Sequence, residues 1–207
     1  MMHWTVTIIK KNFKTTVVAK TGESKGMFYI IDSNVDTSVE IQSILAGEHA
    51  SFTIGIIALV GKGKKISIKT SQRHEYPSTK SSLYLKSIVF DKGVSYFKGS
   101  IRVEPNACAS DAYQRSDTLL LGGNAEGINE PSLEILCDDV KCSHGATCGS
   151  IPSDAQWYGE TRGIGGKKFD ILYAKGFLRA LGSLMGNDKH KKQVEKYIED
   201  ILQWRTL

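Results

Sequence analysis

The sequence predicts a mainly β chain that ends in a small helical region, and three observations support this. From Met1 to about Leu136, short runs of branched and aromatic residues alternate with Gly, Asn, Asp and Ser, which is typical of strands separated by turns. No convincing helical pattern occurs in that region. After Gly149, apolar residues recur at the three- and four-residue spacing of amphipathic helices. We therefore expect a β domain at residues 1–150 and a helical domain at residues 151–207.

Ten segments of the β region have the character of strands. They are rich in branched and aromatic residues, and several alternate apolar with polar residues, as half-buried strands do. They are Trp4–Ile9, Thr15–Ala19, Met27–Ile31, Val39–Leu45, Phe52–Val60, Lys65–Lys69, Ser82–Phe90, Val94–Ile101, Thr118–Leu121 and Leu133–Leu136. Their pattern leaves a sandwich, a barrel and a β-solenoid open. The absence of a sharp sequence repeat weakens the solenoid interpretation on pattern alone.

Three helices are expected in the helical region. Ser153–Gln156 has the form of a capping box, which favours a short helix that ends near Arg162. A second helix is expected from about Lys167 to Met185, and a third from about Asp188 to Trp204. Their apolar stripes favour burial in the core of this chain, with a partner-docking groove as the alternative. The stripes comprise Phe169, Leu172, Tyr173, Gly176, Phe177, Ala180, Leu181 and Leu184, and then Val194, Tyr197, Ile198, Ile201 and Leu202.

Composition and charge argue against several classes of protein. The hydrophobic content of 41% and the charged content of 24% are ordinary for a globular domain of 207 residues. The net charge of +5 comes without aromatic residues interleaved among the basic ones, so we expect no nucleic-acid partner. The N-terminus does not resemble a signal peptide. The longest apolar run, Phe52–Val60, is shorter than the roughly 20 residues that span a membrane. We expect a cytoplasmic protein, without a membrane partner and with reduced thiols.

The highest density of reactive side chains lies at Leu133–Thr147, LEILCDDVKCSHGAT, where two thiols, two carboxylates and an imidazole fall within eight residues. The stretch is expected to begin as a buried strand. If the backbone is extended, Cys142 and His144 share one face, because strand side chains alternate. A thiolate and a neutral imidazole on one face can bind iron or zinc. Two ligands do not complete a site, so the others would come from elsewhere in the fold or from another chain. The alternative is a packed thiol beside a hydrogen-bonded ring.

Most common catalytic and cofactor motifs are absent from the sequence. The sequence at Gly61–Lys64 indicates a tight basic turn rather than a phosphate-binding loop. No GxSxG, HExxH or CxxC motif occurs. The four cysteines are too few for a self-contained cluster site. We expect Cys108, Cys137 and Cys148 to be core thiols.

A long ordered series of motifs resembles the core of the SufB/SufD family, the scaffold subunits of the Suf iron–sulfur cluster assembly system. The matching segments are FKGSIRVEPNACASDAYQRSDTLLL at Phe97–Leu121, PSLEILCDDVKCSHGATCG at Pro131–Gly149, and DAQWYGETRGI…GF at Asp154–Phe177. The KCSHGAT form is more similar to SufD than to SufB. The resemblance implies a right-handed parallel β-helix followed by a small helical domain. Members of this family are longer and carry an N-terminal helical region, whereas this sequence begins directly in strands.

The resemblance also implies a non-catalytic subunit. Such a subunit pairs through its β-helix with a SufB-like chain or with itself. The ABC-type ATPase SufC would dock on the C-terminal helices, here Pro152–Leu207. The Cys-x-His of the family carries over to Cys142 and His144, near the subunit interface. There a partner would supply further ligands to iron or to a transient iron–sulfur cluster, and no cofactor is expected to be bound stably.

Two other functions stay open at this point. One is a structural adaptor that pairs subunits and docks the ATPase, without a ligand role for Cys142 or His144. The other is a β-solenoid enzyme with Asp138, Asp139 and His144 as acid–base groups, against which the missing catalytic motifs argue. An exposed Cys142–His144 pair at a subunit interface would favour the scaffold. A buried thiol with a satisfied ring would favour the adaptor, and a deep cleft around Asp139 would favour the enzyme.

Overall fold

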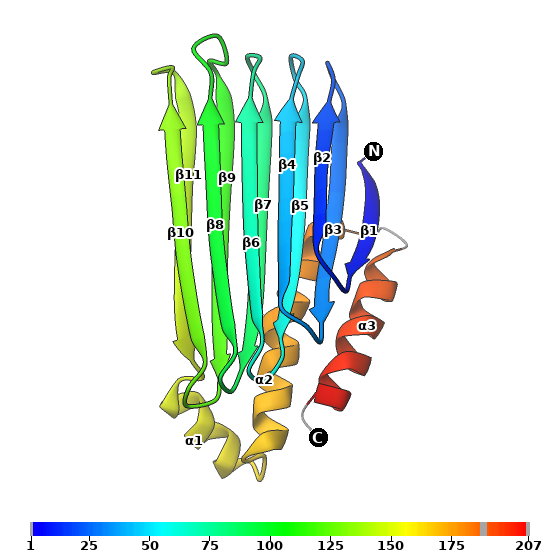
Figure 1. Cartoon of the computed structure of the whole chain (residues 1–207), viewed down its shortest axis with the longest axis vertical. Coiled ribbons are helices and arrows are strands. Elements are labelled where there is room, and N and C mark those ends of the chain that lie inside the picture. Colours follow the sequence, from blue (N-terminus) through cyan, green and yellow to red (C-terminus); the bar gives the residue numbers. More distant parts are fainter. Residues whose placement is uncertain (1, 187–189, 206–207) are drawn as a thin grey trace.

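The computed structural model describes residues 2–186 and 190–205, in which eleven strands precede the helices (Figure 1). The strands are β1 (His3–Ile9), β2 (Phe13–Ala19), β3 (Ser24–Ser33), β4 (Thr37–Leu45), β5 (Ser51–Val60), β6 (Lys65–His74), β7 (Lys80–Phe90), β8 (Val94–Val103), β9 (Ser110–Leu121), β10 (Glu126–Ile135) and β11 (Val140–Ser150). The helices are α1 (Ser153–Thr161), α2 (Lys167–Arg179), the 3₁₀ helix η1 (Ala180–Met185) and α3 (His190–Arg205).

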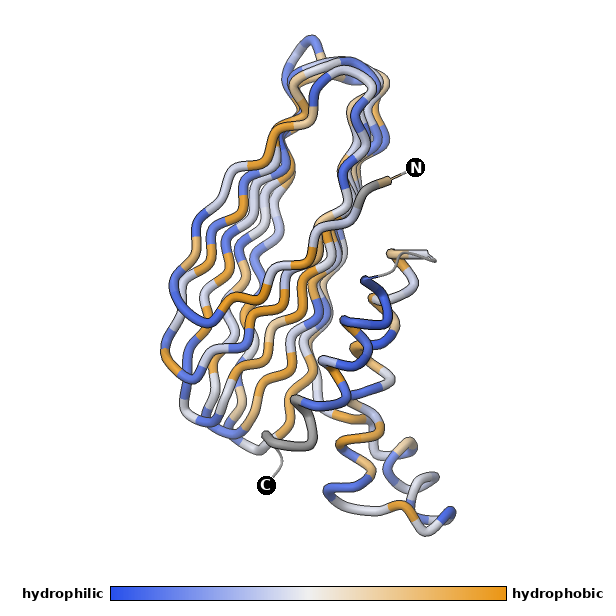
Figure 2. Tube along the Cα trace, turned by 90° about the vertical axis from the view of Figure 1, so that its right-hand side faces the viewer, coloured by the Kyte–Doolittle hydropathy of each residue, from blue (hydrophilic) through white to orange (hydrophobic). Residues whose placement is uncertain are grey.

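The strands form a parallel β-helix, as the family resemblance implied. Successive strands alternate between a sheet of order β1-β3-β5-β7-β9-β11, here called sheet A, and a sheet of order β10-β8-β6-β4-β2, here called sheet B. All strand pairs are parallel. Each pair from β2/β3 to β10/β11 is one turn of the coil, called a rung below, and the rungs stack along one axis (Figure 2). The sandwich and the barrel are therefore excluded.

The interior of the coil changes from apolar to polar along its axis. The inner faces of β3, β4 and β5 supply Ile31, Ile41 and Ile54 to a large apolar core cluster. Farther along, buried polar side chains take over much of the interior, namely Thr70, Gln72, His74, Ser81, Ser87, Ser95, Ser110, Gln114 and Ser116. Because the inner residues differ from rung to rung, the stacked coil leaves no sharp repeat in the sequence.

Helices α2, η1 and α3 pack on the outer face of sheet A and form a second core cluster with it, whereas α1 lies beyond the ends of the strands (Figures 1 and 2). Ile57 of β5 and Leu178 of α2 both belong to this cluster, and the Tyr197 hydroxyl of α3 donates to Asp32 Oδ2 over 2.8 Å. Phe52–Val60 is a continuous apolar run because β5 is covered on both faces, by the coil interior and by the helices.

The helical predictions are right in outline and wrong in several details. Pro152 occupies the N-cap of α1 and no side chain caps that helix, so the predicted capping box is absent. The second helix changes at Ala180 into η1. Leu172, expected in the buried stripe, is exposed, and Ala174 is buried instead. The predicted start of the third helix at Asp188 and the side chains of Ile201 and Leu202 lie outside the described residues.

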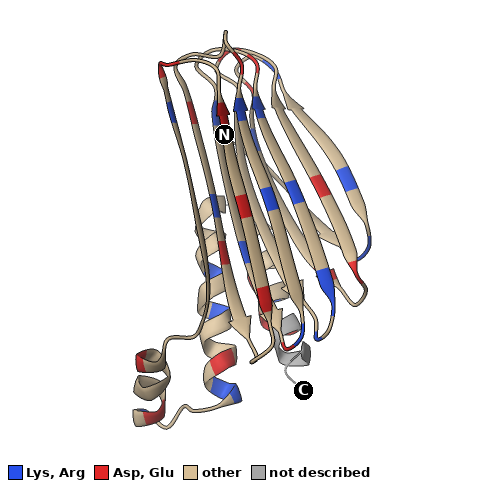
Figure 3. Cartoon of the chain, turned by 60° about the vertical axis from the view of Figure 1, so that its left-hand side comes forward, with Lys and Arg blue, Asp and Glu red and all other residues tan. Residues whose placement is uncertain are grey.

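The outer face of sheet B carries charges of both signs, distributed over neighbouring strands (Figure 3). Lys14 of β2 pairs with Glu40 of β4 at 3.0 Å, and Arg102 of β8 pairs with Glu134 of β10 at 2.6 Å. These pairs link strands that are neighbours in the sheet, as cross-strand charge pairs do. The boundary between strands and helices falls after Ser150. Whether residues 1–150 and 151–207 are separate domains stays a prediction.

Candidate functional site at the uncovered end of the coil

The last rung, β10 and β11, leaves one end of the coil uncovered. Each strand is the edge of its sheet in the described part of the chain. Leu133 of β10 has 37% of its surface exposed, whereas Ile101, its register partner on β8, has 0%. The prediction of a strand at Leu133–Ile135 is confirmed, because these residues belong to β10. The expectation that this strand is buried is wrong, because Leu133 is exposed. We call the inner faces of β10 and β11, with their free backbone edges, the open end.

Cys142 and His144 lie on the inner face of β11. Cys142 is in register with Ala112 of β9, and His144 is in register with Gln114, both of which are buried inside the coil. The extended backbone confirms that the two side chains share one face. The pattern of strands missed β11 itself, because its Gly145, Ala146 and Gly149 lack the branched residues that mark a strand.

Cys142 and His144 differ in their surroundings. Cys142 is half-buried and packs against a small apolar cluster that contains Ile101, Val103, Ala107 and Ala112. Burial raises the pKa of the Cys142 thiol, with a smaller contribution from the negative charge of Asp111, while a hydrogen bond with the Ala112 backbone lowers it. His144 is exposed. The pair thus offers one sheltered neutral thiol and one accessible imidazole, and metal binding would have to displace the thiol proton.

A polar part of the interior lies directly behind His144. The Gln114 side chain crosses the coil to Gly99 of β8, where a Cβ would come within 2.4 Å of Gln114 Nε2. Gln72 Nε2 donates to Gln114 Oε1 over 3.5 Å. Gln114 Nε2 and Gln72 Oε1 are buried without a hydrogen-bond partner in the structure. A buried polar group without a hydrogen-bond partner lowers the stability of a fold. Burial of apolar surface therefore does not explain why this polar interior lies next to the open end.

The other sequence-predicted residues are not gathered into this site. Asp138 and Asp139 are exposed in the loop between β10 and β11. Cys148 lies farther along β11 as an exposed free thiol, so the expectation of a core thiol is wrong there. Within residues 2–186 and 190–205, no group of three or more His, Cys, Asp or Glu side chains could hold a metal ion. Among the described residues, Cys142 and His144 thus remain two donors without a third His, Cys, Asp or Glu beside them.

Cys108 and Cys137 contradict the expectation of reduced core thiols. They form a disulfide between the β8–β9 loop and the β10–β11 loop, with their Cα atoms 5.7 Å apart. Sequence spacing could not reveal this pair, because the two residues are 29 positions apart and only the rung length of the coil makes them neighbours. Gln114 was missed for the same reason, since only the strand register places it beside His144.

Two hollows lie between the helices and the turns at the other end of the strands from the loops of Cys108 and Cys137. One has a volume of about 300 Å³ and includes Lys62, Asp91 and Asp170, and another of about 440 Å³ includes Gln156 and Asp170. Neither surrounds Asp139, so they give no support to acid–base chemistry by that residue. Near them, α1 exposes Trp157 and Tyr158, with 67% and 57% of their surfaces accessible.

The fold and the open end define the class of this protein, a short parallel β-helix with a helical appendage and a Cys-x-His pair on its last strand. The chain belongs to the family described as "SUF system FeS cluster assembly, SufBD core domain", which it matches over residues 7–177. Within that family it is SufD-like.

Three relatives show the extent of the similarity. The chain is 34% identical to the iron–sulfur cluster assembly protein SufD of Escherichia coli over 72% of its own length and 36% of the relative. It is 28% identical to SufD of Bacillus subtilis over 89% of its length and 44% of the relative. It is 35% identical to the chloroplastic protein ABCI7 of Arabidopsis thaliana over 61% of its length and 25% of the relative. The chain therefore spans less than half the length of these relatives. None of the helices described is both long and apolar enough to cross a membrane.

Proposed function

We propose that this chain is a SufD-like scaffold subunit of the Suf system, acting in the cytoplasm without enzymatic turnover of its own. Its partners would be a SufC-like ATPase and a SufB-like subunit or a second copy of itself. The observation that carries the proposal is the placement of Cys142 and His144 on the inner face of an edge strand that no other described strand covers. Iron or a nascent iron–sulfur cluster is the cargo of this site rather than a resident cofactor.

The donor set suits such a cargo. A thiolate and an imidazole are suitable ligands for iron, and Cys142 and His144 supply one of each from a single face. A second subunit that extends the coil beyond β11 would bring its own ligands opposite them. A site divided between two subunits can open when they move, which suits a cluster that must be released.

Two surfaces support the proposed partners. The open end presents free backbone edges on both sheets and the partly exposed apolar side chain of Leu133, which is what strand-to-strand pairing with another coil requires. The exposed aromatic side chains of Trp157 and Tyr158 on α1 suit the docking of an ATPase, because aromatic residues are enriched at protein interfaces.

The proposal is tested by anaerobic co-purification with a SufC-like ATPase and a SufB-like subunit, followed by measurement of iron and sulfide. The variants are Cys142→Ser and His144→Ala, and Cys148→Ser is the matched control because that thiol also lies on the inner face of β11. A stable complex that loses iron in the first two variants but not in the control supports a shared cluster site. Unchanged iron in both variants would reject the ligand roles.

A structural adaptor is the second candidate, because the apolar and edge-strand features of the open end would pair subunits without any metal. In that case the complex forms normally and its iron content does not depend on Cys142 or His144. Failure to form any complex with either partner would reject both the scaffold and the adaptor. Replacing Trp157 with Ala tests the ATPase surface separately, and it should weaken only the contact with the ATPase.

A further inference from the structure

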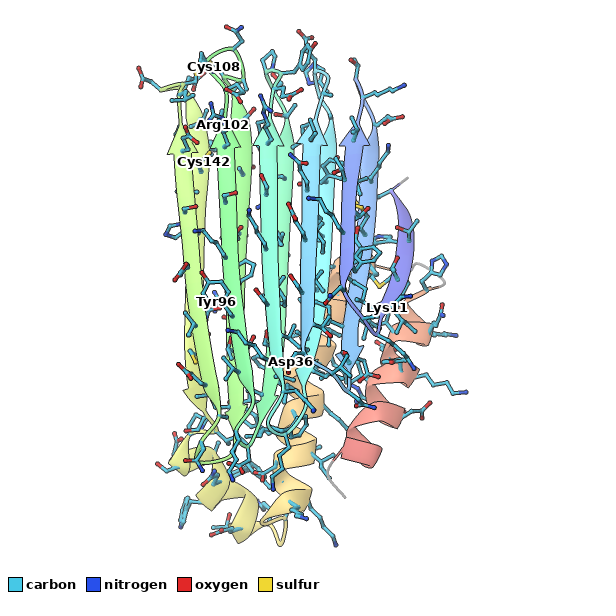
Figure 4. All side chains as sticks on the ribbon, in the orientation of Figure 1. Lys11, Asp36, Tyr96, Arg102, Cys108 and Cys142 are labelled. Carbon is cyan, nitrogen blue, oxygen red and sulfur yellow. A yellow bond between two sulfur atoms is a disulfide. The ribbon has the colours of Figure 1, made fainter. Side chains whose placement is uncertain are left out.

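The Cys108–Cys137 disulfide lies at the same end of the strands as Cys142 (Figure 4). Its two residues occupy loops of successive rungs, and their Cα separation of 5.7 Å is common for a disulfide that needs no backbone movement. The loop that contains Cys137 leads directly into β11, the strand of Cys142 and His144. The covalent link therefore ties the start of the candidate site to the rung behind it.

Apart from the β9–β11 pairing and the hydrogen bond from the Leu136 amide to the Val103 carbonyl, two further contacts tie this part of the last rung to the rung behind it. Among the described strands, β11 pairs with β9 along one edge and with none along the other. Its loop is held to the preceding rung by a hydrogen bond from the Ala109 amide to the Asp139 carbonyl and by the packing of Val140 and Cys142 on their small apolar cluster. In contrast, the inner rungs are paired on both edges of both strands. The disulfide accordingly makes a larger contribution to order here than it would farther inside the coil.

The disulfide is also accessible to reagents. Cys108 and Cys137 are only half-buried, and both lie in surface loops. In the reducing compartment that the proposed function implies, disulfides are typically transient or redox-sensing rather than permanent. This step rests on the proposed function, whereas the presence and position of the disulfide do not.

We infer that Cys108 and Cys137 form a reversible redox site, with a dithiol reductant as its reaction partner, that clamps the last rung when oxidised. A thiolate of the reductant attacks one sulfur of the disulfide and releases the other as a thiol. The second thiol of the reductant then displaces the remaining protein sulfur. Two electrons pass to the protein, which gains the thiols of Cys108 and Cys137, and the reductant leaves as its own disulfide. Reduction frees the loop and loosens the beginning of β11, including Cys142.

The first test counts thiols in the folded chain equilibrated with mixtures of reduced and oxidised dithiothreitol, by alkylation and intact mass. The oxidised protein should carry two alkylated thiols, those of Cys142 and Cys148, and the reduced protein four. The change should be complete without denaturant and reversed by oxidised dithiothreitol. A disulfide that resists the reductant until the protein unfolds, or four free thiols under oxidising conditions, would overturn the inference.

The second test follows amide hydrogen exchange at residues 136–147 in both redox states. Reduction should speed exchange there by about tenfold or more, while exchange in β5 stays unchanged. The double variant Cys108→Ser/Cys137→Ser should exchange at the fast rate in both states, and Cys148→Ser should behave as wild type. Equal exchange in oxidised and reduced wild type would reject the clamp. Because neither test uses iron or a partner, its outcome is independent of the proposed cluster role.

Discussion

His144 on β11 is the register partner of Gln114 on β9, yet Gln114 is fully buried and His144 is exposed. The difference arises because one more rung covers Gln114, whereas no strand covers β11 in the described part of the chain. A subunit that continued the coil would give His144 the surroundings that Gln114 already has.

The contact between Gln114 and Gly99 gives the first prediction. In Gly99→Ala the new methyl group would meet the Gln114 amide, with Nε2, Oε1 and Cδ all within 2.6 Å of the ideal Cβ position. We expect the free energy of unfolding to fall by about 1–3 kcal/mol through overpacking, measured by urea denaturation. Gly145→Ala is the control, because a Cβ at that position meets nothing within 4 Å, and it should leave stability unchanged or slightly raised.

The open end gives the second prediction. Leu133→Lys places a charge on the exposed inner face of β10, where it should be tolerated in the single chain but unfavourable beneath a second coil. We expect the affinity for the pairing subunit to fall by about tenfold or more, measured by light scattering of the complex. Val35→Lys, at an exposed apolar residue between β3 and β4, is the control. Equal binding by both variants would place the pairing surface elsewhere.

Much of the fold was predictable from the sequence because strand residues follow local rules. Leu83 and Leu85 alternate with Ser82 and Tyr84 along β7, and alternation of this kind identified most strands. The architecture was not predictable from pattern, because stacking in a coil depends on contacts between rungs whose inner residues differ. The family resemblance supplied that step. The strand pattern missed β11, because its small residues carry a weak strand signal.

The candidate site was predictable only in part. Alternation along an extended backbone placed Cys142 and His144 on one face, and this is local information. Three other features depend on which residues lie one rung apart. They are the exposure of this pair, the polar side chain of Gln114 behind it, and the disulfide between Cys108 and Cys137. Which residues lie one rung apart is set by the number of residues in each rung, and no motif in the sequence indicates that number.

The disulfide leads to the third prediction, on stability. Under oxidising conditions, Cys108→Ser/Cys137→Ser should lower the free energy of unfolding by roughly 3 kcal/mol, since the disulfide joins residues 29 positions apart and restricts the unfolded chain. With an excess of reductant, wild type and variant should unfold at the same urea concentration. A difference that persisted after reduction would mean that the serines disturb the folded loops, and the disulfide itself would then not be the cause.

The fourth prediction concerns Cys142. Burial, the largest cause, raises the pKa of its thiol, so its reaction with iodoacetamide should accelerate only at a pH above the usual range for cysteine. The rate is measured residue by residue, by mass spectrometry of the alkylated peptides. Cys142→Ser removes the signal and identifies it. A rate that levels off at or below the ordinary thiol pKa would show that a positive group or a hydrogen bond outweighs burial at this site.

The fifth prediction follows from His74, a buried imidazole inside the coil. Its Nδ1 lies 2.8 Å from Thr79 Oγ1 and its Nε2 lies 2.8 Å from Ser81 Oγ. Burial lowers the pKa of His74 from 6.5 to about 4, although the charge of Asp111 acts in the opposite direction. The folded protein therefore binds a proton less readily than the unfolded chain. The contribution of neutral His74 to stability is fully present above about pH 6.5.

That contribution should be lost progressively as the pH falls from about 6.5 towards 4, and it should amount to about 3 kcal/mol when the loss is complete. Urea denaturation of wild type and His74→Gln over this range measures it, since glutamine retains hydrogen-bonding groups and does not titrate. Carboxylates other than Asp111 affect both proteins alike, so the difference between the two curves reports His74 together with its interaction with Asp111. We expect the stability advantage of wild type over the variant to shrink across this range. Parallel curves would show that His74 is protonated equally in the folded and unfolded states, as it would be if water reached it inside the coil.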